Sequence, residues 1–185
     1  VAGAEGCDDG ANGDDTDGCL DTCAVSPGYV CSGDPSVCNT VCGDGIMAGS
    51  EACDDGNTSD NDGCAADCSS TETGWTCSGT TPTVCDEICG DGLIRGAEGC
   101  DQGGVDNPPS DGDGCSATCT TETGYNCTGE PSVCAPGCGD GIAAGSEECD
   151  DGEGDGAPDN GDGTSTCTDS CTDNVCGDGY MAGSE

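Results

Sequence analysis

The sequence predicts a chain of small disulfide-rich repeats, with short β-hairpins and turns and little other regular secondary structure, arranged as an elongated tandem array. Three observations predict this class. Cysteine and glycine are abundant, with 22 Cys and 36 Gly in 185 residues. Large apolar side chains are too few for an ordinary core, since Phe is absent and there is 1 Trp. The cysteine spacings also recur along the chain, which indicates internal repeats.

The cysteines divide the chain into repeats, and we number the cysteines of each repeat first to sixth. The first and second are always 11 residues apart and the third and fourth always 4, whereas the second and third are 12, 11, 15 or 18 apart. Fixed spacings indicate cross-linked corners, and the variable one indicates a surface loop. The predicted units are repeat 1 (1–41, six-cysteine type, N-terminally incomplete), repeat 2 (42–88, six cysteines), repeat 3 (89–137, six cysteines), repeat 4 (138–175, four cysteines) and the start of a further repeat (176–185).

Disulfides are the expected state of these cysteines. A metal-thiolate protein would need clustered thiols, but the closest spacing is 4 and His is absent. Dense cysteine frameworks are typical of oxidising compartments, which predicts an extracellular or cell-surface protein. Repeat 4 lacks the fifth and sixth cysteines together, so these two are expected to bond each other. The other four cysteines of a repeat allow three pairings, and none is chosen here. The predicted pairs are Cys31–Cys38, Cys77–Cys85 and Cys127–Cys134.

Short hairpins are the main expected elements, at residues 28–38, 74–85 and 124–134. Each segment has an aromatic residue before a cysteine, a turn with Gly or Pro, and Val before the closing cysteine. The Asp-Gly pairs of the recurring Cys-Gly-Asp-Gly predict turns, with Asp44, Asp91, Asp140 and Asp178 as turn caps. Residues 50–53 and 65–68 each fit a single helical turn.

The segment from Cys42 to Gly79, CGDGIMAGSEACDDGNTSDNDGCAADCSSTETGWTCSG, resembles the myxobacterial cysteine-rich repeat. That repeat occurs in tandem in large secreted and surface proteins of bacteria and some protists, and the resemblance covers essentially the whole chain. It implies an extracellular, disulfide-bonded, non-catalytic module and no particular biochemical activity. Three departures are local: Gln102 replaces the second Asp of CDDG, DGTSTC at 162–167 spreads out the usual DGC, and repeat 4 lacks its hairpin.

Acidic residues recur at fixed distances from the cysteines, and the formal net charge is -38 with Arg95 as the single basic residue. Oxygen ligands from turn-rich loops suit Ca²⁺, and a bound divalent ion would relieve the repulsion between like charges. The Asp-x-Asp-Gly stretches at 60–63 and 111–114 also look like half of the calcium loops of thrombospondin type 3 repeats. The alternative is that the acids are solvated turn residues. The predicted metal ligands are Glu5, Asp8, Asp9, Asp17, Glu51, Asp54, Asp55, Asn57, Asp62, Glu98, Asp101, Asp113, Glu147, Asp150, Asp151 and Asp162.

The composition argues against several other functions. An anionic chain with a single Arg is not expected to bind nucleic acid, and it has no apolar run long enough to enter a bilayer. We expect no enzymatic activity, because His and Lys are absent and the acids lie in repeated surface loops with no cleft-forming core. Asn57 and Asn126 fit the N-glycan acceptor pattern.

The chain begins and ends within its own motif, and three explanations stay open. It is a segment of a longer tandem array, a subunit whose two incomplete repeats complete each other head to tail, or an arbitrary cut. We expect Cys176 to bond a partner outside the chain, supplied by another copy or by further repeats of the same chain. The predicted function is structural: a calcium-stabilised, disulfide-stapled array forming a fibre, stalk or surface layer. The alternative is a non-catalytic binding or adhesion module of a larger secreted or surface protein.

Overall fold

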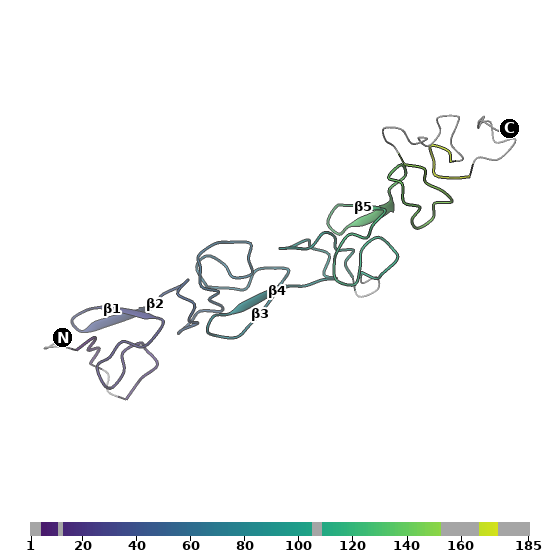
Figure 1. The fold of residues 1–185 in the computed structure, drawn as a ribbon. Coiled ribbons are helices and arrows are strands. Elements are labelled where there is room, and N and C mark those ends of the chain that lie inside the picture. Colours follow the sequence, from purple (N-terminus) through teal and green to yellow (C-terminus); the bar gives the residue numbers. More distant parts are fainter. Residues whose placement is uncertain (1–4, 11–12, 105–108, 153–166, 174–185) are drawn as a thin grey trace. The chain divides into compact units, whose positions relative to one another are not determined.

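The computed structural model describes residues 5–10, 13–104, 109–152 and 167–173. These residues contain short strand pairs among irregular turns and no helix (Figure 1). The chain divides into two compact units, Val1–Ile88 and Cys89–Glu185, and the division falls at the boundary between repeats 2 and 3. The part of the chain that is described has no helix long and apolar enough to cross a membrane.

Each six-cysteine repeat has one two-stranded antiparallel sheet. In every hairpin the fifth and sixth cysteines lie directly opposite each other in the register and are bonded, with a Cα–Cα distance of 4.0 Å. These are the three pairs that the joint loss of both cysteines from repeat 4 indicated. The strands are β1 (Tyr29–Gly33) with β2 (Ser36–Thr40), β3 (Trp75–Ser78) with β4 (Val84–Glu87), and β5 (Tyr125–Thr128) with β6 (Val133–Pro136).

The first four cysteines of a repeat form a cross-linked loop system, which we call the ring. The sequence left three pairings open, and the structure has the nested one. The first cysteine bonds the fourth, in Cys42–Cys68, Cys89–Cys119 and Cys138–Cys171. The second bonds the third, in Cys7–Cys19, Cys53–Cys64, Cys100–Cys115 and Cys149–Cys167.

The interior of each repeat is built from sulfur. In the described residues every buried hydrophobic side chain is a cysteine. The valines of the hairpins lie at the surface, with Val37 63% and Val133 72% exposed. The glycine before the third cysteine lies close to both the aromatic ring and the sixth cysteine of the hairpin: a Cβ atom added at Gly114 would lie 2.5 Å from Cys134 Cβ and 2.7 Å from Tyr125 Cδ1. Disulfide bonds therefore provide the stabilisation of the folded state that a hydrophobic core provides in larger domains.

The prediction of a helical turn at residues 50–53 and at residues 65–68 is wrong, because the structure has no helix there. At Ala48–Glu51 and at Ala65–Cys68 the chain makes one turn, in which the later N–H donates to the earlier carbonyl three residues before it. The second turn cannot continue as a helix because Cys68 has a φ of 56°, in the left-handed region where helices end.

Consecutive repeats within a unit meet through equivalent contacts. In the first unit a Cβ added at Gly28 of repeat 1 would lie 2.7 Å from Ala48 Cβ of repeat 2. A Cβ at Gly124 would lie 2.8 Å from Ala144 Cβ, so the next repeat packs directly against this turn. The same joint therefore occurs in both units.

Candidate metal centre and aspartate nest

The acidic residue that follows the second cysteine lies inside the fold. Asp54 and Asp101 have 0% of their surface exposed. The Asp54 carboxylate accepts hydrogen bonds from the N–H groups of Gly43, Gly45 and Gly56, each at 2.9 Å, and uses both of its oxygens. Backbone N–H groups that converge on one anion form a nest. We call this arrangement the aspartate nest.

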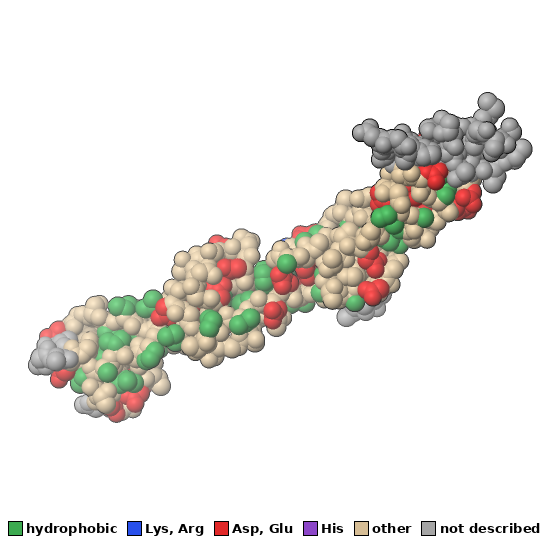
Figure 2. Space-filling view, in the orientation of Figure 1, with side chains coloured by type: hydrophobic (Ala, Val, Ile, Leu, Met, Phe, Trp, Pro, Cys, Tyr) green, Lys and Arg blue, Asp and Glu red, His purple; other side chains and the backbone are tan. Residues whose placement is uncertain are grey.

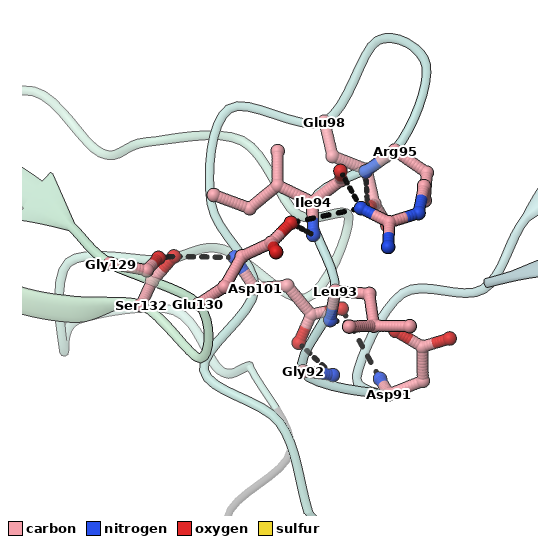
Figure 3. Close-up of polar contacts among 10 residues, drawn as sticks. All are labelled: Asp91, Gly92, Leu93, Ile94, Arg95, Glu98, Asp101, Gly129, Glu130 and Ser132. Carbon is pink, nitrogen blue, oxygen red and sulfur yellow. Dashed lines mark hydrogen bonds and ion pairs between the residues drawn. The ribbon is translucent and has the colours of Figure 1, made fainter. Parts of the chain in front are cut away.

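The nest recurs in repeats 3 and 4. Asp101 accepts N–H groups of Gly90 (2.7 Å), Gly92 (3.0 Å) and Gly103 (2.7 Å), and Figure 3 shows its carboxylate facing Gly92. Desolvation acts to raise the pKa of Asp150, but its N–H donors outweigh desolvation and hold the pKa below the usual 3.8. Those donors belong to Gly139 (2.8 Å), Asp140 (3.2 Å), Gly141 (3.1 Å) and Gly152 (2.8 Å).

Three residues expected among the metal ligands are thus acceptors for the backbone. The carboxylates of Asp54, Asp101 and Asp150 face the positive ends of N–H dipoles, which attract a carboxylate and repel a cation. They tie the Cys-Gly-Asp-Gly segment to the ring. The aspartate within that segment caps its own turn, as predicted, since Asp44 Oδ1 accepts the Ile46 N–H at 2.9 Å.

The tip of each hairpin closes over the nest of its own repeat. Asp54 N–H donates to Thr83 Oγ1 (3.0 Å) and the Thr83 N–H donates back to the Asp54 carbonyl (2.8 Å). In repeat 3 the tip also carries an ion pair: Glu130 Oε1 accepts from Arg95 Nη1 at 2.9 Å and from the Ile94 N–H at 2.8 Å (Figure 3). The hairpin tip is therefore tied to the backbone of the nest aspartate.

The glutamate before the second cysteine makes a reciprocal turn. Glu51 Oε2 accepts the Ala48 N–H at 2.8 Å, and the Glu51 N–H donates to the Ala48 carbonyl. Glu98 makes the same two hydrogen bonds with Arg95, and Glu147 makes them with Ala144. Ligand atoms of Glu51, Asp54 and Cys68 lie within 4.8 Å of one another, and equivalent groups surround the two later first–fourth bonds. The cysteines of these groups are in disulfides, so they offer no thiolate to a metal.

The best candidate for a cation site is a pair of carboxylates at the start and the end of the variable loop, which joins the second and third cysteines of a repeat. Desolvation and then the charge of Asp62 raise the pKa of Asp55, because the two carboxyl groups are in contact. In repeat 1 the Cys19 N–H donates to Asp17, which by itself lowers the pKa, but the neighbouring Asp9 carboxyl raises it overall. We call Asp9–Asp17 and Asp55–Asp62 the acidic pairs. The four carboxylates of these pairs are half-buried, and Figure 2 shows that other acidic side chains lie at the surface of both units.

The acidic pair of repeat 1 lines a surface pocket together with Ser36, Val37 and Cys38. In repeat 2 Asn57, another predicted ligand, donates its side-chain N–H to Asp62 Oδ2 at 3.0 Å. A pocket that joins two carboxylates to hydroxyl and carbonyl oxygens has the hard oxygen donors that Ca²⁺ prefers.

Repeat 3 carries an altered pair. Gln102 stands where repeat 2 has Asp55, and its Nε2 donates to the backbone carbonyl of Asp113 at 3.4 Å. The structure therefore brings one carboxylate fewer to this position. Glu5 is exposed and Asp151 half-buried, whereas Asp162, the expected partner of Asp151, lies outside the described residues.

Two glutamates position these loops and were missed from the sequence. Glu72 accepts the N–H groups of Asn61 (2.8 Å) and Gly63 (2.9 Å), on either side of Asp62. Glu122 does the same for Gly112 and Gly114, both at 2.7 Å. The available signal was the recurrence of Thr-Glu-Thr-Gly at 71–74 and 121–124. Repeat 1 has Ser26 at this position, and its N–H makes the bond to Gly18 that Glu72 makes to Gly63.

The remaining predicted sites differ in accessibility. Asn57 and Asn126 are both exposed, but the Asn57 side-chain nitrogen is engaged with Asp62. Asn126 lies on β5 opposite Ala135. Cys176 lies outside the described residues.

Comparison with known families gives a consistent description. Residues 23–69 and 117–156 match the family described as a domain of unknown function (DUF4215). The first match covers the hairpin of repeat 1 and the ring of repeat 2, and the second covers the hairpin of repeat 3 and the beginning of repeat 4. No curated protein matches the chain. The matched regions and the disulfides together show a cysteine-rich repeat protein.

Proposed function

We propose that the protein is an extracellular, non-enzymatic structural module, a disulfide-stapled and calcium-stabilised repeat array that builds a fibre, stalk or surface layer. The observation that carries the proposal is the composition of the interior. Every buried hydrophobic side chain in the described residues is a cysteine. Each repeat thus depends on bonds that form in oxidising compartments, and a covalent interior suits a mechanical role in an exposed setting.

The recurring joint supports an array. Gly28 of repeat 1 lies against Ala48 of repeat 2, and Gly124 of repeat 3 lies against Ala144 of repeat 4. Contacts that repeat between neighbours allow a protein to be extended one unit at a time. The expected partners are therefore further repeats of the same chain or copies of it, joined head to tail.

A non-enzymatic role fits the chemistry of the acidic positions that recur in each repeat. The acids nearest the cysteines accept backbone N–H groups, as Asp54 and Glu51 do. Such carboxylates hold turns in place and are not free to act as acids or bases. The sequence offers no His or Lys to replace them.

Calcium is the ligand that the acidic pairs favour. Two carboxyl groups in contact raise each other's free energy when both are ionised, and a divalent cation between them removes this cost. Asp55 and Asp62 belong to one such pair, and Glu72 fixes the backbone around Asp62. Binding would hold the start and the end of the variable loop together and so stabilise the folded repeat.

Calorimetric titration of the whole chain with CaCl₂ tests this proposal. We expect Asp55→Asn and Asp62→Asn each to remove one binding event and Gln102→Asp to add one. The matched control is Asp44→Asn, which changes a turn cap and should leave the stoichiometry intact. Titrations that are identical for all four variants would show that the acids serve solubility alone.

The binding-module alternative is favoured by exposed valines on the hairpins, such as Val37 and Val84, which are 63% and 56% exposed. Electron microscopy separates the two functions. A structural array gives filaments from the purified chain without added ligand. A recognition module stays dispersed and binds a specific glycan or protein, and substitution of Val37 and Val84 by Thr would weaken that binding.

A further inference from the structure

Asp-Gly pairs recur throughout this chain, and an Asp-Gly pair is a place where the backbone can rearrange without an enzyme. Glycine has no side chain to hinder its nitrogen, which can attack the carboxyl carbon of the preceding aspartate and close a succinimide ring. Water opens that ring to isoaspartate, in which the main chain runs through the former side chain. The described residues contain ten Asp-Gly pairs, so the fold decides which of them react.

Nine of the ten glycines donate their N–H to a carboxylate elsewhere in the fold, at distances between 2.7 and 3.1 Å. Such a hydrogen bond must break before the nitrogen can turn toward the preceding carboxyl group. The negative charge of the acceptor also opposes loss of the N–H proton, which the attack requires. The nine bonds run from Gly10 to Asp8, from Gly45 and Gly56 to Asp54, from Gly63 to Glu72, from Gly92 to Asp101, from Gly112 and Gly114 to Glu122, and from Gly141 and Gly152 to Asp150.

The exception is Asp17–Gly18, at the end of the variable loop of repeat 1. Gly18 is buried, and within the described part of the chain its N–H has no acceptor. The cause is Ser26, whose N–H donates to the Gly18 carbonyl at 2.9 Å, as Glu122 N–H donates to Gly114 at 3.0 Å. Ser26 therefore stands in the place of the loop glutamate but has no carboxylate to receive the glycine N–H.

The pair Asp113–Gly114 of repeat 3 is a matched control for Asp17–Gly18. In both pairs the aspartate Oδ1 accepts the N–H of the following cysteine, at 3.3 Å and 3.1 Å respectively. Both glycines have a positive φ, 104° and 98°. Both also lie against the aromatic ring and the sixth cysteine of the hairpin, so that an added Cβ would collide with them. The clear difference between the pairs is the carboxylate of Glu122.

We propose that Asp17 is the site of spontaneous isoaspartate formation in the folded repeats. The Gly18 nitrogen bonds to Asp17 Cγ, and its proton leaves with the hydroxyl of the protonated carboxyl group as one water molecule. A second water molecule then cleaves the ring at the former main-chain carbonyl, which becomes a free carboxyl group. The mass is unchanged and no oxidant or other reactant is needed. The backbone gains one carbon atom beside the Cys7–Cys19 bond.

Ageing of the whole oxidised chain tests the proposal, and the test depends neither on calcium nor on fibre formation. The chain is incubated at neutral pH with EDTA, which keeps divalent ions away from Asp17. Samples are then reduced, digested and mapped by electron-transfer fragmentation, which assigns isoaspartate to single residues. Deamidation of Asn12 is recognised separately because it changes the mass. The reduced, alkylated chain in urea gives the rate of each Asp-Gly pair without the fold.

Each rate in the folded chain is divided by the rate of the same pair in urea. We expect this ratio to be at least about tenfold higher for Asp17 than for Asp113, the factor that corresponds to one hydrogen bond to a charged group. Ser26→Glu should lower the ratio of Asp17 to that of Asp113, and Glu122→Ser should raise the ratio of Asp113 to that of Asp17.

Equal ratios for Asp17 and Asp113 in the unmodified chain would overturn the proposal, and this readout does not depend on how either variant folds. A higher ratio at Asp17 that Ser26→Glu leaves unchanged would overturn the missing carboxylate as its cause.

Discussion

Repeats 1 and 2 have the same hairpin and the same bond between the second and third cysteines, and they differ in what covers the aspartate beside them. In repeat 2 the Cys-Gly-Asp-Gly segment lies over Asp54, and both Asp54 and Cys68 are 0% exposed. In repeat 1 the equivalent Asp8 is exposed and Cys23 is half-buried. The backbone at Cys23 nevertheless keeps the left-handed conformation of Cys68. The ring therefore holds its shape without the segment, whereas burial of the aspartate depends on it.

The largest expected effect comes from removing the nest charge. Asp54→Asn places an amide N–H₂ against N–H donors in a buried site, so we expect the free energy of unfolding to fall by about 1.5–3 kcal/mol, the usual contribution of a hydrogen bond to a charged group. Asp8→Asn should cause a much smaller loss. Urea unfolding followed by the fluorescence of Trp75, with disulfides intact, measures both. Equal losses of stability in the two variants would mean that the Cys-Gly-Asp-Gly segment adds nothing to the stabilisation by Asp54.

The second comparison concerns the variable loop. Glu72 receives several loop N–H groups in repeat 2, whereas repeat 1 has Ser26 in its place. Because Glu72 is only half-buried, Glu72→Gln should lower the free energy of unfolding by about 1 kcal/mol, at the low end for such bonds. It should also weaken calcium binding at Asp55–Asp62. Ser26→Ala is the matched control, and an equal effect of that variant would contradict the holding role of Glu72.

Acidification extends the comparison to repeat 4, whose nest is filled and whose described residues include no hairpin. The folded pKa of Asp150 lies below the usual 3.8, so its contribution to stability is present above that value and is lost as the pH falls through the folded pKa. We expect the protection of the Gly141 and Gly152 amides against hydrogen exchange, measured relative to their intrinsic rates, to fall below about pH 4 by this linkage. Asp150→Asn should remove the pH dependence, and an unchanged profile in that variant would contradict the assignment.

The smallest effect is kinetic. Partial burial and the charges of Glu5, Asp8, Asp9 and Asp21 raise the pKa of Cys23 above 9.0. Only the thiolate reacts, so alkylation of Cys23 by iodoacetamide should be slow at neutral pH. The alkylation rate should keep rising beyond pH 9. An unperturbed thiol has a pKa of about 8.5, so its ionisation levels off in that range. Mass spectrometry of the labelled peptide identifies the site, and a rate at Cys23 that levels off near pH 9 would contradict the raised pKa.

The hairpins and their disulfides were predictable because the information is local. An aromatic residue, a turn and two cysteines lie within a dozen positions, and the loss of both cysteines from repeat 4 identifies the pair. The ring pairing was not predictable, because four cysteines at these spacings fit three pairings equally well. Its solution depends on Cys68, whose left-handed backbone turns the chain back toward Cys42.

The role of the acids was harder to predict for a related reason. Sequence shows where carboxylates lie but not which groups face them. Asp54 and Asp55 are neighbours in the chain, yet the first faces three N–H groups and the second faces another carboxylate. Only the first arrangement follows from the fold of the Cys-Gly-Asp-Gly segment, which lies 9 to 11 residues earlier.

The contact between Arg95 and Glu130 bears on how proteases act on the chain. Trypsin-like proteases cut after a basic side chain that they draw into an acidic pocket, and Arg95 is the only such side chain in the sequence. Its guanidinium is already paired with a carboxylate, and its backbone N–H is bound to Glu98. Trypsin-like enzymes thus have one site in this chain, and its side chain must leave an ion pair with Glu130 before it can enter their pocket.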